Sequence, residues 1–78
     1  MARVELQASG SVETVTRLID LARERGFVVV LEDEAGLATG SGRMAIEPPN
    51  IDKQAVARAA VQALINEVPG GPATFTLV

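Results

Sequence analysis

The chain has 78 residues with 10 acidic and 7 basic side chains, which gives a formal net charge of −3, and it contains no cysteine and no histidine. A chain of this length forms one small core, because only about 60% of its unfolded surface becomes buried. The composition excludes disulfides, thiolate metal sites and histidine-based catalysis, and it argues against a nucleic-acid binder, which needs a basic patch. We therefore expect a single domain over residues 1–78.

The N-terminal segment and the apolar runs indicate an intracellular protein. Residues 1–5 include Arg3 and Glu5, two charges where the apolar core of a signal peptide would lie. The longest purely apolar run, residues 27–31, is far too short to cross a bilayer. We expect a cytoplasmic location and no contact with membranes.

The first half of the chain predicts a strand, a helix and a second strand. Apolar and polar residues alternate over residues 3–8, which is typical of a strand with one buried face. Ser11 is a suitable N-cap for the helix that follows, and Gly26 occupies the C′ position, where a left-handed backbone is needed. Three consecutive valines within residues 27–33 favour a strand over a helix.

A glycine-rich loop and a third strand come next. Residues 34–42 form the loop, with a short added strand at 37–39 as one option, and residues 43–47 form the strand, which Pro48 ends. Residues 40–43, Gly-Ser-Gly-Arg, have the composition of an anion cradle. They precede a strand rather than a helix, however, and this favours a flexible hairpin loop.

The last segments complete the predicted topology. A second helix, capped by Asn50 or Asp52, runs to about Val68 and ends in the turn 69–72, and residues 73–78 form a fourth strand. The order βαββαβ predicts an α+β, ferredoxin-like fold: a four-stranded antiparallel sheet of order 4-1-3-2 with two helices on one face.

Lys53 is the only lysine in the chain and the only candidate for covalent amine chemistry. It lies in the first turn of the predicted second helix, where nothing would desolvate it, so a solvated side chain is the better interpretation. We predict no enzymatic activity, no catalytic residue, and neither a metal nor another cofactor.

Glu32, Asp33 and Glu34 form the densest charge cluster. Such a cluster suits a hard cation or a basic partner, but consecutive strand residues point to opposite faces, so the carboxylates converge only if the strand has ended. A solubilising strand end is therefore the favoured interpretation. An acidic inhibitor that binds and blocks a basic, nucleic-acid-binding partner is one alternative function.

A resemblance gives another alternative. The order of strand, Gly-x-apolar turn, helix and Gly-hydrophobic strand resembles the ACT regulatory domain, a small ligand-sensing module. The Asp-x-Pro-Gly-x-Leu turn of that family corresponds to residues 7–12, where Gly10 and Val12 match it, while Gln7 and Ser9 replace its Asp and Pro. The resemblance implies a binding site for an amino acid or another small carboxylate near Gly10 and Ser11.

The predicted sheet leaves one face without helices. We expect this face to carry Arg3, Glu5, Gln7, Arg43, Glu47, Thr74 and Thr76. If Phe27, Val29 and Leu31 face the helices, Val28 and Val30 lie on the open side of an edge strand, where they invite pairing with another chain. We therefore expect a regulatory or protein-interaction module. It acts as a homodimer, or on another protein, through its sheet face or its edge strand, and Val28, Val30, Glu32, Asp33 and Glu34 are the candidate contacts.

Overall fold

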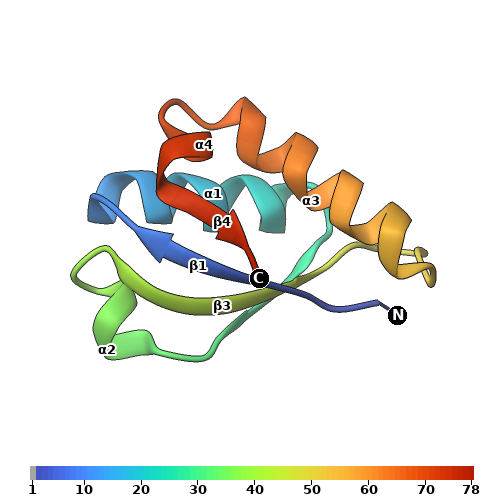
Figure 1. Cartoon of the computed structure of the whole chain (residues 1–78), viewed down its shortest axis with the longest axis horizontal. Coiled ribbons are helices and arrows are strands. Elements are labelled where there is room, and N and C mark those ends of the chain that lie inside the picture. The colour runs from blue at the N-terminus through green and yellow to red at the C-terminus, as the bar shows by residue number, and fades with distance from the viewer. Residues whose placement is uncertain (1) are drawn as a thin grey trace.

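The protein has an α+β fold with one four-stranded antiparallel sheet (Figure 1). The computed structural model describes residues 2–78. Its elements are β1 (Val4–Ser9), α1 (Val12–Glu24), β2 (Val28–Leu31), α2 (Glu34–Leu37), β3 (Ser41–Glu47), α3 (Gln54–Glu67), α4 (Gly71–Thr74) and β4 (Phe75–Leu77). The strand order β2-β3-β1-β4 is the predicted order 4-1-3-2 counted from the other edge, so the predicted sheet is confirmed.

The two central strands, β1 and β3, fix the register of the sheet. Val4 lies opposite Ile46 and Leu6 opposite Met44, and all four side chains are fully buried. A shift of one residue would turn these side chains to the other face, so their burial allows only this register.

The boundaries of α1 follow the predicted capping residues. Ser11 accepts a hydrogen bond from a first-turn amide through its Oγ, at 3.2 Å. At the other end Gly26 has a φ of 81°, its N–H donates to the Arg23 carbonyl, and the Phe27 N–H donates to the Ala22 carbonyl. This pair of hydrogen bonds is a Schellman motif, which turns the chain from α1 into β2.

The connection from β2 to β3 differs from the prediction. The N–H groups of Glu32 and Asp33 both donate to the Arg43 carbonyl, so the ladder ends in a bulge and β2 is shorter than residues 27–33. The short strand proposed at 37–39 is wrong, because Asp33 accepts the Gly36 N–H through Oδ1 at 3.0 Å and starts the helix α2.

The caps predicted for α3 are also wrong. Its N-cap is Lys53, without a side-chain hydrogen bond, and Asn50 has a φ of 57° in the preceding loop. The predicted turn at 69–72 partly forms α4, since Gly70 takes a left-handed conformation and proline is accepted in a first helical turn. As a result β4 is shorter than residues 73–78.

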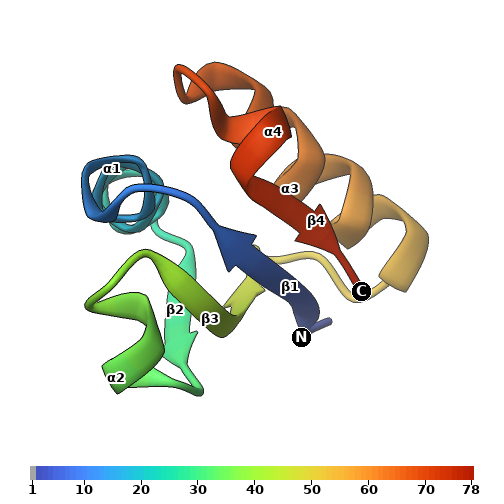
Figure 2. The same ribbon diagram turned by 60° about the vertical axis from the view of Figure 1, so that its left-hand side comes forward.

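α1 and α3 contact each other and pack on the same face of the sheet (Figure 2). Their buried side chains form one core with the inward residues of the strands. This core contains Val4, Leu6, Ala8, Val15, Leu18, Ala22, Leu37, Met44, Ile46, Ala57, Val61, Leu64, Ile65, Val68 and Phe75. The other face of the sheet carries mostly exposed side chains.

Candidate functional site

The face of the sheet away from α1 and α3, which we call the open face, combines charged side chains with two valines. It includes Arg3, Glu5, Gln7, Val28, Val30, Glu32, Arg43, Ala45, Glu47 and Thr76. Of the residues predicted for this face, only Thr74 is wrong, because it ends α4 instead of lying in β4.

Arg3 and Glu47 form an ion pair across the two central strands. The distance between Arg3 Nη2 and Glu47 Oε2 is 3.5 Å, and the two side chains are 49% and 20% exposed. A pair this accessible to water contributes about 0–1 kcal/mol, so it aligns the strands more than it stabilises them.

Glu5 and Glu32 bring two carboxyl groups together on the open face. Ala45 pairs with Glu5 in β1 and with Val30 in β2, and its small side chain is fully buried beneath its neighbours. The Glu5 Oε2 atom is also buried, and it has no hydrogen-bond partner within residues 2–78.

The pKa of Glu32 is raised, first by a side-chain hydrogen bond with Glu5, then by burial and by the charge of Glu5; Arg43 and Arg3 act in the opposite direction. A hydrogen bond between two carboxyl groups requires a proton on one of them. Glu32 therefore holds a proton more tightly than an isolated glutamate does.

Within residues 2–78, β2 forms one edge of the sheet and pairs only with β3. The Glu32 N–H points to β3, and neighbouring strand residues alternate in direction, so the backbone groups of Val29 and Leu31 point outward. The side chains of Val29 and Leu31 pack on the core, whereas Val28 is 46% exposed and Val30 is half-buried on the open face. The positions of Val28 and Val30 are as predicted.

The acidic cluster after β2 is divided among different places. Glu32 lies on the open face beside Glu5, Asp33 caps α2, and Glu34 is exposed in the first turn of that helix. The carboxylate of Asp33 is thus used within the fold. Within residues 2–78, no three acidic side chains are arranged to hold a metal ion.

Gly10 and Ser11, the residues expected near a small ligand, are closely surrounded. The Gly10 N–H donates to the Gly40 carbonyl at 2.8 Å, and a Cβ on Gly10 would approach the Thr74 side chain. The Ser11 Oγ is used to cap α1 through the Thr14 N–H. The donor of Gly10 and the hydroxyl oxygen of Ser11 are therefore engaged within the protein.

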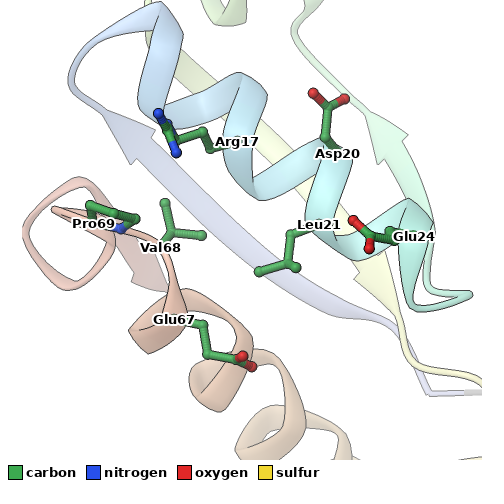
Figure 3. A pocket seen from close by; sticks show the side chains of 7 residues that line it. All are labelled: Arg17, Asp20, Leu21, Glu24, Glu67, Val68 and Pro69. Carbon is green, nitrogen blue, oxygen red and sulfur yellow. The ribbon is translucent and has the colours of Figure 1, made fainter.

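The sequence did not predict a groove of about 290 Å³ between the C-terminal parts of α1 and α3 (Figure 3). Leu21, Val68 and Pro69 form its apolar part, and it is also lined by Arg17, Asp20, Glu24 and Glu67. No local motif marks it, because its walls come from two helices that are far apart in the sequence.

Arg25 and Glu67 join the ends of α1 and α3 next to this groove. The guanidinium donates two hydrogen bonds to the carboxylate. This contact raises the pKa of Arg25 and lowers the pKa of Glu67. The acid at this end of the groove is thus already paired with a cation of the protein.

Comparisons with protein-family models, curated proteins and solved structures found no match to the chain. Among the helices of residues 2–78, none is long and apolar enough to cross a membrane. The open face and the β2 edge are therefore the features of the molecule that bear on function.

Proposed function

We propose that this chain is a non-enzymatic, ferredoxin-like interaction module of the cytoplasm, which forms a homodimer by pairing the β2 edges of two copies. The unpaired outer edge of β2 carries the proposal. Its sequence, Val28–Leu31, contains no charge and no proline. Edges are normally protected by such residues or by a covering segment, because free N–H and C=O groups pair with other chains.

The β2 sequence suits antiparallel pairing with a second copy of itself. If the two-fold axis passes through Val30, the outward groups of Val29 face those of Leu31 in the second copy and make about four hydrogen bonds. Val30 then packs on Val30 of the second copy, and Glu32 lies opposite Val28. No like charges are directly opposed, so this register avoids cross-strand repulsion.

The size of the domain also favours association. A chain of 78 residues without cysteine has a small core and no disulfide to add stability. Pairing of two edges extends the sheet and covers part of Val28, which is 46% exposed. Both effects bury surface that one copy leaves in water.

The two alternative functions have less support. A ligand near Gly10 and Ser11 would have to compete with the hydrogen bonds to Gly40 and Thr14. An inhibitor that uses the acidic cluster would have to do so mainly with Glu32 and Glu34, since Asp33 caps α2.

The test compares Val30→Lys with Thr76→Lys by sedimentation. We expect the wild type to be a dimer at micromolar concentration. Val30→Lys should weaken it at least about tenfold, since it places two like charges at the two-fold axis. Thr76→Lys adds the same charge to the same face at the opposite edge, so it should leave the dimer intact.

Other sedimentation results would contradict the proposal or assign the interface to a different surface. A wild type that stays monomeric at tens of micromolar contradicts the proposal. Equal dissociation by both variants would indicate pairing through the whole open face instead of the β2 edge. Thermal unfolding of both variants checks that each remains folded.

A further inference from the structure

We infer that Glu5 and Glu32 share one proton and that this proton strengthens the pairing of the β2 edges, so that association tightens as the pH falls. The inference rests on the proposed function, because it concerns the regulation of the same edge. One of the two acids, Glu5, lies in the middle of the sheet, and the other, Glu32, lies at its edge.

The pair connects the centre of the sheet to the edge. Glu5 lies in β1 and is held over Ala45, where one of its carboxyl oxygens is buried. Glu32 directly follows β2, and the bulge at the Arg43 carbonyl fixes its backbone. The carboxyl group of Glu32 at the edge is therefore hydrogen-bonded to the carboxyl group of Glu5, two strands away.

The other charged groups around Glu5 and Glu32 do not lower the pKa of Glu32 enough to cancel its rise. Arg43 of β3 and Arg3, which directly precedes β1, favour ionised carboxylates, yet the pKa of Glu32 is raised despite them. Arg3 is also engaged by Glu47 of β3. Asp33 is turned into the cap of α2, and β2 and β4 contribute only uncharged side chains to this face.

Pairing of the β2 edges affects the protonation of Glu32 because it removes water from the carboxyl group. In the proposed register, Glu32 lies opposite Val28 of the second copy, so pairing removes water from one side of its carboxyl group. A carboxylate loses hydration free energy in this step, and a protonated carboxyl group loses much less. The dimer therefore holds the proton more tightly than the monomer, and by linkage the proton favours the dimer.

The direction of the pH effect follows from the raised pKa. The contribution of the proton to association is complete below the raised pKa that Glu32 has in the monomer, and it is lost as the pH rises through the still higher pKa that Glu32 has in the dimer. Association should therefore tighten as the pH falls and weaken as it rises.

The experiment measures the dimer Kd at about pH 5.5 and about pH 8 for the wild type and two variants. We expect the wild type to associate several-fold more tightly at the lower pH. In Glu5→Gln the amide donates to the Glu32 carboxylate at every pH, so this added dependence should disappear.

Glu24→Gln is the matched control. It removes the same charge from the C-terminal end of α1, away from the open face, and should keep the full pH dependence. Lower pH also reduces the net negative charge of the whole protein, but that general effect is the same in both variants. Equal pH dependence in Glu5→Gln and Glu24→Gln would overturn the inference.

A second measurement examines the pair without the dimer. In the Val29→Pro variant, which loses an outward N–H of β2 and gains no charge on the open face, a carbon-13 NMR titration of the monomer should show a raised pKa for Glu32 that returns toward its ordinary value when Glu5→Gln is added. An ordinary pKa of Glu32 in the monomer overturns the inference. A wild-type dimer with equal Kd at both pH values overturns the inference alone, whereas a wild type that is monomeric at both overturns the proposed function as well.

Discussion

The two edges of the sheet are built differently, although each edge strand adjoins a four-residue helix. At β4, the Val78 N–H donates to the backbone carbonyl of Glu5, so by alternation the Phe75 and Leu77 N–H groups point away from the sheet. The Phe75 N–H is bound by the Gly71 carbonyl of α4. At β2, the outward groups belong to Val29 and Leu31, and no element pairs with them in the described chain.

The difference lies in how each short helix meets its strand. α4 leads directly into β4 and uses an outward N–H of that strand. α2 follows β2, and its hydrogen bonds are local, from Gly36 to the Asp33 side chain and from Leu37 to the Asp33 carbonyl. Arg58 of α3 adds a hydrogen bond of 2.9 Å to the Val78 carbonyl. A short helix thus protects an edge only where it binds the outward groups of the strand.

The largest expected effect comes from removing the protection of β4. A Cβ at position 71 would overlap the Ile65 carbonyl oxygen, so Gly71→Ala should displace α4. We expect a loss of about 2–4 kcal/mol in the free energy of unfolding, measured with a denaturant. The amide of Phe75 should also exchange its hydrogen faster, because its acceptor has moved.

Gly70→Ala is the control for this change. Gly70 has a φ of 77°, but a Cβ there would contact nothing within 4 Å. We expect a smaller loss of about 1 kcal/mol from the strained backbone, without faster exchange at Phe75. Equal losses in the two variants would contradict a specific role of the contact between Gly71 and Ile65.

The next largest effect is expected from substitutions that remove an outward N–H group from one edge or the other. Val29→Pro removes an outward N–H of β2 but keeps the hydrogen bonds between β2 and β3. Leu77→Pro removes an outward N–H of β4 but keeps the hydrogen bonds between β4 and β1. Both positions are partly buried. We expect Val29→Pro to weaken dimerisation at least about tenfold in sedimentation, because each copy loses a hydrogen bond across the interface.

Leu77→Pro should leave the dimer intact. A dimer that dissociates only with Leu77→Pro would assign the interface to β4. Hydrogen exchange of the amides of the central strands provides the check that both variants keep the sheet.

The sequence predicts the sheet well because its signals are local and strong. Gly26 and Ser11 mark the ends of α1, and Pro48 follows the last residue of β3. Alternation in β2 also places Val28 and Val30 correctly on the open face. Their role in binding stays a prediction.

The short helices and the acid pair could not be predicted in the same way. A helix of four residues has no periodic apolar face, so α2 is marked only by Asp33 three residues before Gly36. In the sequence alone, Asp33 instead belongs to the acidic cluster of residues 32–34. The contact between Glu5 and Glu32 depends on a small residue, Ala45, in the strand between them, and thus on the register of three strands.

The smallest effect is expected from substitutions of Asp33, which should change the stability of α2 without changing dimerisation through the β2 edge. Asp33→Ala removes the N-cap that accepts the Gly36 N–H and should cost about 1 kcal/mol in the free energy of unfolding. Asp33→Asn removes the charge but keeps an oxygen acceptor, so it should cost only a few tenths of a kcal/mol. Since α2 covers no outward group of β2, both variants should dimerise like the wild type. Weaker dimerisation in both would show that the charge of Asp33 contacts the partner, and the open edge would then extend beyond β2 into α2.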